Sequence, residues 1–491
     1  MAGAVLASGC AAAAPPAVPA AGEAPRFPRL ATYYIESHLD PAAREVMVRT
    51  DLLVIDAEAG ALDRAPIDAI RAARPDALVL AYLTSEEIAR TPLAEQPLAT
   101  ARFPRIPPSA WVVEPGSPLT APVTATDTRL PVASGAAFTL TRPASPFYGP
   151  DEPTYLLVGA EHMKLVAIDG DTLVVERGYR SQATPHAAGA RVASHVVFFA
   201  GTWMLNIAST APAEHGRTWR DLLAEEAGDL VARGPWNGIF LDVCFEDVGW
   251  LNGGLLDLDR DGGADDPKVA SRWWSDGMGL LIDRVRAQVG PDVPVVSNPG
   301  AQDCPHPALD GILMEGWPIG MPEGWLAWDV GYRRYQRWSR HRRGLTIANG
   351  FSPRIGLGTI EAGEDELART DYAAMRFGLA VALLGDGFYT FDNGIFGHYV
   401  AWWYDEYDGA GRGLRWLGAA RGPARAQGAV RWREFDHGLA VVNLGHEPAR
   451  FRAPPGFARL RGRQDPGHNN GAPVEGELAI AARDAYILVR R

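Results

Sequence analysis

Short apolar runs alternate with longer helical stretches along most of this chain, and this repetition constrains the fold more than any other feature. The runs are rich in Val, Ile and Leu, as in 52–56 and 238–242. Near-continuous apolar strands that alternate with helices are typical of a parallel sheet covered on both faces. About eight such units predict an α/β fold, a closed (β/α)8 TIM barrel. An open doubly wound sheet is the runner-up, but the sequence lacks the glycine-rich phosphate loop that it favours.

The predicted barrel strands follow from these apolar runs. The end of the cycle stays open because two runs, Thr346–Asn349 and Gly387–Asp392, both qualify as the eighth strand. The seven earlier runs are Leu30–Ile35, Leu52–Asp56, Leu78–Leu83, Met204–Ile207, Gly238–Asp242, Val293–Asn298 and Gly311–Glu315.

Two segments interrupt the repeat. From about Pro107 to Val197 the chain is rich in Pro, Thr and Val and alternates like antiparallel β-structure. We predict a small β-rich module, 107–197, inserted in the barrel after the third strand, with a linker or substrate-rim role. Alternating hairpins at the end of the chain predict a C-terminal antiparallel β-sandwich domain over 428–491. The catalytic barrel accordingly spans 27–427.

The first 26 residues resemble an export segment. The sequence Leu6-Ala7-Ser8-Gly9 before Cys10 is similar to a bacterial lipobox, in which Cys10 carries the lipid, and an Ala/Pro-rich linker follows. The usual basic region before the apolar run is missing, so an Ala-rich tail is the alternative. We expect a protein that is secreted, or lipid-anchored at the bacterial cell surface or periplasm. The other two cysteines, Cys244 and Cys304, fit either a disulfide or two buried thiols.

Charge restricts the partners. The net charge of -12 disfavours nucleic acid as a partner. The chain has two lysines, Lys164 and Lys268, and neither ends a predicted strand, which argues against Schiff-base chemistry. A composition of 47% hydrophobic and 22% charged residues suits a large globular core, and we expect a monomer.

Polar and aromatic side chains end most of the predicted strands, where barrel enzymes place their active sites. Carboxylates and amides hydrogen-bond sugar hydroxyl groups, and aromatic rings pack against sugar rings. The alternative for each is a structural role, such as capping the next helix. The predicted substrate-binding residues are Tyr33, Asp56, Glu58, Tyr82, Asn206, Asn298, Trp317 and Asp392.

Two acids stand out as a catalytic pair. Glycoside hydrolysis uses two carboxyl groups that face one bond, one as acid and the other as nucleophile or base. Asp242 directly follows the buried run Gly238–Leu241, and Glu315 follows Gly311–Met314 in the same way. One strand separates the two runs, so the side chains can face each other across the barrel mouth. We assign Asp242 as nucleophile or base and Glu315 as general acid, and the reverse stays open.

Other hydrolytic chemistries find less support. The eleven histidines include no His-x-His and no His-Glu-x-x-His pattern, which metal-dependent hydrolases commonly carry. A Gly-x-Ser-x-Gly nucleophile elbow is also missing.

An acidic loop follows the Asp242 strand. Asp257, Asp259 and Asp261 alternate, Gly262 comes next, and Asp265 stands where a later ligand is expected. Hard oxygen ligands at this spacing suit a structural Ca²⁺ ion. Lys268 replaces the final glutamate of an EF-hand loop, so a solvated loop without an ion is the alternative.

Several of these motifs together resemble the enzymes grouped as hypothetical glycosyl hydrolase family 15. The motifs are GIFLDVCFEDVG, DLDRDGGADD, VVSNPG, ILMEGWP and WWYDEYDGAGRGLRW, and FDHGLAVVNLG is similar to β-domains that follow glycosidase barrels. The resemblance implies a glycosidase whose strand-end acids are Asp242 and Glu315, acting on a poly- or oligosaccharide. The alternatives are a non-catalytic carbohydrate-binding barrel on the cell surface and a lyase or hydrolase acting on a polymer or sugar ester.

Overall fold

The computed structural model describes residues 24–143, 151–300, 306–318, 328–341, 343–354, 364–394 and 397–491. Cys10, the expected lipid attachment site, lies outside these residues, and so does Cys304 of the disulfide alternative. Within the described part of the chain, no helix combines the length and the apolar character needed to cross a membrane.

Eight parallel strands form the central sheet, and their order in the sheet follows the chain. The circle closes where Leu30 forms a parallel bridge with Tyr389, whose backbone N–H donates to Arg29 O at 3.0 Å. The chain therefore folds as the predicted TIM barrel. The strands are β2 (Ala31–Tyr34), β3 (Leu52–Asp56), β4 (Leu78–Thr84), β15 (Gly238–Asp242), β16 (Val295–Ser297), β17 (Gly311–Glu315), β18 (Ile347–Phe351) and β19 (Phe388–Asp392).

The prediction that Met204–Ile207 forms a barrel strand is wrong. Strand β14 (Thr202–Met204) pairs antiparallel with β5 (Glu87–Ala89), outside the barrel. The fourth barrel strand is β15, which pairs directly with β4. The two runs that both qualified as the eighth strand form β18 and β19, and both belong to the barrel. A short apolar run has the same pattern inside the barrel and beside it, so periodicity alone could not separate the two.

Strand alternation decides which side chains point into the barrel. Successive side chains of a strand face opposite sides, so residues two apart share a face. Phe240 of β15 and Leu313 of β17 belong to the inner cluster of buried residues. Asp242 and Glu315, each two residues further on, therefore lie on the inner face at the carboxyl end.

Local sequence explains where the helices begin and end. Asp266 accepts hydrogen bonds from the backbone N–H groups of Lys268 and Val269 at 3.0 and 3.1 Å, and Pro267 occupies the first helical position of α6. Gly290, with φ at 86°, follows the last residue of α6. The helices are α1 (Pro41–Met47), α2 (Ala57–Leu62), α3 (Arg64–Ala73), α4 (Pro97–Arg102), α5 (Trp219–Arg233), α6 (Pro267–Val289), α7 (Trp328–Trp338), α8 (Glu364–Arg369), α9 (Tyr372–Leu383) and α10 (Asp405–Asp408).

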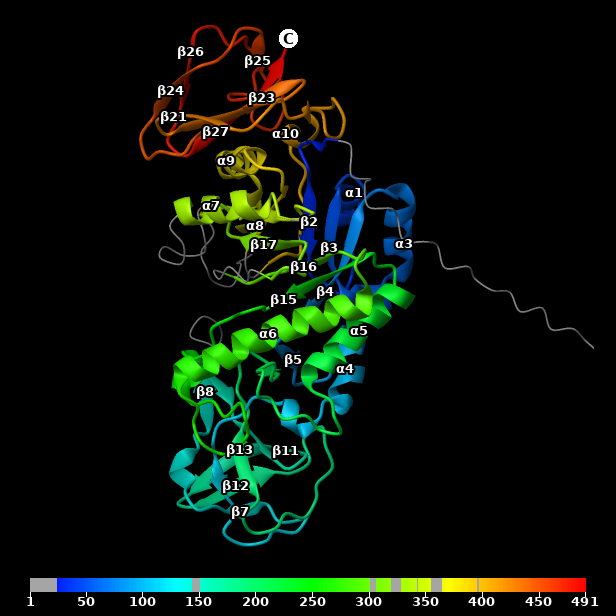
Figure 1. The fold of residues 1–491 in the computed structure, drawn as a ribbon, viewed down its shortest axis with the longest axis vertical. Helices are drawn as coiled ribbons and strands as arrows, with labels where there is room; N and C mark the ends of the chain where they lie inside the picture. The colour runs from blue at the N-terminus through cyan, green and yellow to red at the C-terminus, as the bar shows by residue number, and fades with distance from the viewer. Residues whose placement is uncertain are drawn as a thin grey trace, which may run out of the picture.

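The inserted module is a six-stranded antiparallel sheet with a hydrophobic core of its own. Figure 1 shows it at one end of the long axis of the molecule, with the C-terminal sheets at the other end and the barrel between them. In sheet order its strands are β6 (Ser117–Pro118), β13 (Arg191–Ser194), β10 (Tyr155–Val158), β11 (Glu161–Asp169), β12 (Thr172–Glu176) and β7 (Arg129–Pro131), and β8 (Thr141–Pro143) pairs separately with β9 (Asp151–Pro153).

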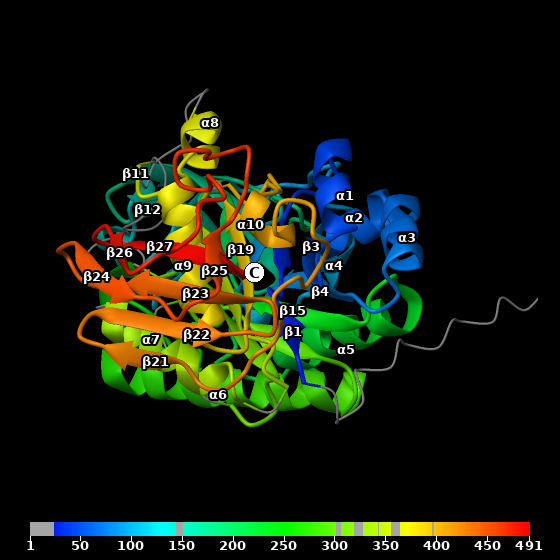
Figure 2. The same ribbon diagram turned by 90° about the horizontal axis from the view of Figure 1, so that it is seen from above.

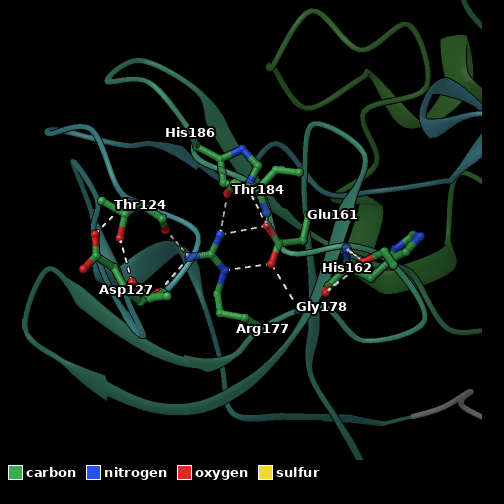
Figure 3. A network of polar contacts seen from close by, with 10 residues as sticks. Thr124, Asp127, Glu161, His162, Arg177, Gly178, Thr184 and His186 are labelled. Atoms are coloured by element: carbon green, nitrogen blue, oxygen red, sulfur yellow. Dashed lines mark hydrogen bonds and ion pairs between the residues drawn. The ribbon is translucent and has the colours of Figure 1, made fainter.

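A buried carboxylate organises this module (Figure 3). Arg177 donates to both oxygens of Glu161, from Nε at 2.7 Å and from Nη2 at 2.8 Å. His186 Nε2 lies 2.9 Å from Oε2, and the backbone N–H of Thr184 donates to the same oxygen at 3.0 Å. Both ends of the loop 177–186 are thus held in place by one glutamate.

The C-terminal part contains a five-stranded antiparallel sheet and a separate two-stranded one. Their facing sides share a hydrophobic core that includes Leu439, Phe451 and Ile480. Arg376 of α9 ties this part to the barrel, because it donates to both oxygens of Asp484 at 2.7 and 2.9 Å. In Figures 1 and 2 the larger sheet covers α9. The larger sheet runs β21 (Arg425–Gln427), β22 (Val430–Glu434), β23 (Gly438–Asn443), β27 (Asp484–Arg490), β25 (Phe457–Arg459), and the smaller pairs β24 (Ala449–Arg452) with β26 (Glu477–Ile480).

Candidate active site

Asp242 lies at the carboxyl end of β15, on the inner face of the barrel. The hydroxyl group of Tyr82, on the neighbouring strand β4, donates to Asp242 Oδ2 at 2.6 Å. Asp242 keeps part of its surface exposed. Its carboxyl group is therefore held by a neutral donor on one side and open to a ligand on the other.

Glu315 lies two strands away and accepts hydrogen bonds at both oxygens. Asn298, which follows β16, donates from Nδ2 to Glu315 Oε2 at 3.1 Å. The same side chain forms a hydrogen bond that lowers the pKa of Asp242. One amide group thus lies between the two acids, as the strand order of the sequence-based prediction requires.

His398, which the sequence analysis missed, is the second partner of Glu315. Its Nε2 lies 3.2 Å from Glu315 Oε1, and its Nδ1 lies 2.8 Å from Asp392 Oδ2. Asp392 also accepts from Nδ2 of Asn349 at 2.8 Å. His398 and Asp392 are almost fully buried, with 3% and 1% of their side chains exposed against 11% for Glu315. They support Glu315 from behind.

The charge states of the site follow from burial and from these contacts. Burial and, to a smaller extent, the charge of Glu315 raise the pKa of Asp242, the hydrogen bond from Tyr82 opposes the rise, and the net value is about 6. For His398, burial lowers the pKa, but Asp392 and Glu315 outweigh burial and bring it to about 10. At neutral pH His398 is therefore an imidazolium ion that donates to both acids.

Aromatic rings line the inner face beside the acids. The rings of Tyr82 and Phe240 stack with centroids 6.0 Å apart, and Tyr33 packs against His398 with centroids 4.3 Å apart. Tyr33 is buried, whereas Tyr82 remains partly exposed. Of the two predicted tyrosines, Tyr82 presents surface to the mouth and Tyr33 covers the histidine.

Asp56 ends β3 and Glu58 lies at the start of α2, and the two have different environments. Asp56 lies on the inner face and also caps α2, since its Oδ1 accepts from the backbone N–H of Glu58 at 2.9 Å. Burial raises the pKa of Asp56 to about 7, against the effect of that hydrogen bond. Glu58 instead accepts from the backbone N–H groups of Leu98 and Ala99 at 2.7 and 2.8 Å, which anchors the start of α4. The structure thus places Asp56 at the mouth, whereas both carboxylate oxygens of Glu58 are used to hold α4.

Two other predicted residues are not part of the mouth. Asn206 is fully buried outside the barrel strands, where Nδ2 donates to Leu258 O at 2.8 Å and Oδ1 accepts from Ala208 N at 3.0 Å. Trp317 is 4% exposed, and its indole N–H donates to Gly378 O at 3.0 Å. Both side chains support the fold, because each satisfies a buried backbone group.

The predicted ion loop folds beside the mouth, between β15 and α6. Asp257, Asp259 and Asp261 each offer a carboxylate oxygen within 4.8 Å of the other two. Asp265 is not one of these three, and its Oδ2 accepts from the backbone N–H of Leu258 at 2.7 Å.

The profile of the family described as hypothetical glycosyl hydrolase family 15 matches residues 188–439, just over half of the chain. The chain belongs to this family. The match includes β15, β16, β17 and β19, which carry Asp242, Asn298, Glu315 and Asp392, and it identifies a glycosidase-type enzyme.

Solved structures with similar folds include a family GH13_31 enzyme, with 9% identity, a TM-score of 0.43, and coverage of 94% of this chain and 99% of that one. The isomaltulose synthase of Klebsiella sp. LX3 has 10% identity, a TM-score of 0.43, and coverage of 94% and 98%. The trehalulose synthase MutB of Pseudomonas mesoacidophila MX-45 has 11% identity, a TM-score of 0.45, and coverage of 95% and 98%. No curated protein matches the chain. The family match and the geometry of the mouth, and not these distant structures, carry the functional argument.

Proposed function

We propose that this protein hydrolyses glycosidic bonds of a poly- or oligosaccharide, with Asp242 and Glu315 as its catalytic residues. The observation that carries the proposal is the contact of Asn298 with both acids at the carboxyl end of the barrel. Two carboxyl groups that flank one bond are what glycoside hydrolysis requires. Asp56 and Tyr82 supply a hydrogen-bonding side chain and a ring at the rim for a sugar.

The contacts favour Asp242 as proton donor and Glu315 as nucleophile or base, which reverses the roles first assigned from the sequence. Asp242, with its pKa raised to about 6, still holds a proton in part of the molecules near neutral pH. Glu315 faces an imidazolium ion and an amide donor, and both stabilise a carboxylate. Pairs of acids whose environments differ in this way divide the roles of acid and base.

The proposed cycle uses these residues in order. Asp242 gives its proton to the oxygen of the leaving sugar as the glycosidic bond breaks. Glu315, oriented by the hydrogen bond from His398, attacks the anomeric carbon or, as a base, takes a proton from the water that attacks there. In the first route Asp242, now a carboxylate that accepts from Tyr82, takes a proton from the water that then displaces Glu315 from the anomeric carbon.

We expect retention of configuration, because the single side chain of Asn298 hydrogen-bonds both acids, which indicates a short separation between their carboxyl groups. Carboxyl groups of retaining enzymes lie about 5–5.5 Å apart, and those of inverting enzymes about 6.5–9.5 Å. A proton NMR spectrum of the first product tests this. The proposal expects the anomer of the substrate, and the opposite anomer would assign Glu315 as a base.

A panel of polysaccharides tests the function itself. Hydrolysis releases one new reducing end per bond cleaved, whereas transfer to another sugar rearranges linkages without a net gain of reducing ends. We expect new reducing ends from at least one polysaccharide. Transfer products alone would make the protein a transglycosidase. Binding without cleavage would identify the non-catalytic carbohydrate-binding barrel.

A further inference from the structure

The loop between β15 and α6 contains a buried carboxylate oxygen that no group among the described residues satisfies. Asp257 is fully buried, its Oδ2 accepts from the backbone N–H of Gly262 at 3.1 Å, and its Oδ1 has no hydrogen-bond partner in the part of the chain that the structure describes. A buried ionised oxygen left in this state costs several kcal/mol unless a cation or a donor reaches it. This oxygen calls for a ligand that the described residues do not supply.

The surroundings of Asp257 indicate a cation. Carboxylate oxygens of Asp259 and Asp261 lie within 4.8 Å of a carboxylate oxygen of Asp257 and of each other. The charges of Asp259 and Asp261 also raise the pKa of Asp265, after the larger effect of its own burial. Four acids therefore converge on one loop of nine residues, 257–265.

Two arginines near these acids hydrogen-bond to backbone carbonyl groups, although their charges also lower the pKa of Asp257. Arg260 donates to Trp111 O at 3.1 Å, and Arg191 donates to Gly262 O at 2.9 Å and to Pro115 O. Gly262 has φ at 92°, and a side chain there would collide with the Arg191 guanidinium. The arginines thus fix the backbone of the loop and leave the carboxylates turned toward one another.

We propose that Asp257, Asp259 and Asp261 bind one Ca²⁺ ion, and that this ion fastens the inserted module to the barrel. Oxygen ligands only, three of them anionic, suit a hard cation, and Ca²⁺ accepts irregular carboxylate geometry more readily than Mg²⁺. The loop reaches both parts of the molecule. Asp257 pairs with Val113 through a backbone hydrogen bond of 2.9 Å, Arg191 belongs to β13 of the module, and Asp266 caps α6 of the barrel.

Calorimetric titration of the metal-free full-length protein with CaCl₂ tests the site directly. We expect one ion per chain, and a dissociation constant of about 10⁻⁵–10⁻³ M because Lys268 replaces the last acidic ligand of an EF-hand loop. At a hundredfold excess over that constant, the ion should raise Tm by roughly 5 °C. Mg²⁺ at the same concentration should shift Tm much less.

The double variant Asp259→Ala/Asp261→Ala removes two ligands that lie near the surface and leaves the buried Asp257 in place. It should fold and lose both the binding heat and the Tm shift. Asp276→Ala, which removes an exposed acid from α6, is the matched control and should keep both. Circular dichroism confirms the fold of each variant.

Hydrogen exchange then tests the fastening. Ca²⁺ should slow exchange of the backbone N–H groups around 111–114 and 191–196 in the wild type, and not in the double variant. An absence of heat and of a Tm shift with Ca²⁺ would overturn the site, and so would binding that survives in the double variant. Binding without protection of these two segments would overturn the fastening.

Discussion

Two groups of buried carboxylates show how the same residue type serves the fold in one place and chemistry in another. Glu161 of the inserted module accepts from Arg177, His186 and backbone N–H groups, and its side chain is fully buried (Figure 3). Burial would raise the pKa of Glu161, but these hydrogen bonds lower it. Asp242 accepts from a neutral tyrosine, keeps part of its surface open, and has a raised pKa.

The difference lies in the hydrogen-bond partners of each carboxyl group and in its access to solvent. A carboxylate that is fully hydrogen-bonded to cations and backbone is locked in its charged form and cannot exchange a proton near neutral pH. A carboxyl group that is half satisfied and still reachable can exchange one, at a cost in stability. In the module, Glu161 thus holds a loop in place, whereas at the barrel mouth Asp242 and Glu315 have different partners.

The largest expected effect comes from Asp242→Asn. On a polysaccharide, where the leaving sugar needs a proton, kcat/KM should fall by about 10²–10⁴. On an aryl glycoside of the same sugar with a nitrophenolate leaving group, the loss should be much smaller. Initial rates on the two substrates check this, and an equal loss on both would contradict the role of proton donor.

The converse change, Glu161→Gln, should harm the fold and spare the chemistry. Breaking one partner of a buried ion pair costs about 3–5 kcal/mol. Chemical denaturation should show this loss of unfolding free energy. Activity per folded molecule should stay within about twofold of the wild type, because Glu161 lies outside the barrel mouth. Glu176→Gln is the control, because that glutamate lies on the neighbouring strand, is 67% exposed and has only a surface partner. A loss of activity in folded Glu161→Gln protein would contradict the division between the two regions.

His398→Asn probes the support behind Glu315. The variant removes the ring that hydrogen-bonds to Glu315 Oε1 and orients it, so kcat should fall by about 10–100-fold, comparable to the loss of other supporting side chains. KM should change little. A merely structural histidine would lower Tm and leave kcat per folded molecule unchanged.

The two regions should respond to pH in opposite directions. The lowered pKa of Glu161 gives stability that is present above the ordinary glutamate value, about 4.3, and is lost as pH falls further. The raised pKa of Asp242 acts the other way, because its burden on stability grows as pH rises from about 4 to about 6. Denaturation of Glu161→Gln and Asp242→Asn across pH 3–8 should show the first variant converging with the wild type at low pH. Above pH 6, Asp242→Asn should be more stable than the wild type.

The smallest effect is expected for Trp317→Phe. The ring lies inside, next to Tyr335, and the change removes its hydrogen bond to Gly378 O. Stability should fall by about 1 kcal/mol, and KM for any polysaccharide should stay unchanged. A large rise in KM would show that Trp317 contacts the substrate, as the sequence predicts.

Periodicity along the chain was enough to predict the barrel, because alternating apolar strands and helices have few other stable arrangements. It also placed Asp242 and Glu315 together, since side chains at equivalent strand ends share the inner face. The same reasoning failed for Asn206, whose apolar neighbours pack beside the barrel. It also could not see that Glu58 meets the backbone of α4, about 40 residues further along the chain, because that contact depends on tertiary packing.

His398 escaped the sequence analysis for a related reason. It lies on a loop six residues after Asp392, with φ at 53°, so neither strand alternation nor helix spacing predicts where its ring points. The position of a histidine shortly after the last barrel strand was the available clue. Its role became visible only from its two acidic partners.

The catalytic role of the two barrel acids is tested by the release of reducing ends from one cleaved polysaccharide, using equal amounts of folded Asp242→Asn, Glu315→Gln, Glu161→Gln and wild-type protein. We expect both barrel variants to lose at least about 10²-fold in rate, as for the loss of a catalytic carboxyl group, while Glu161→Gln keeps the wild-type rate. Full activity in either barrel variant would show that the pair at the barrel mouth is not the catalytic centre.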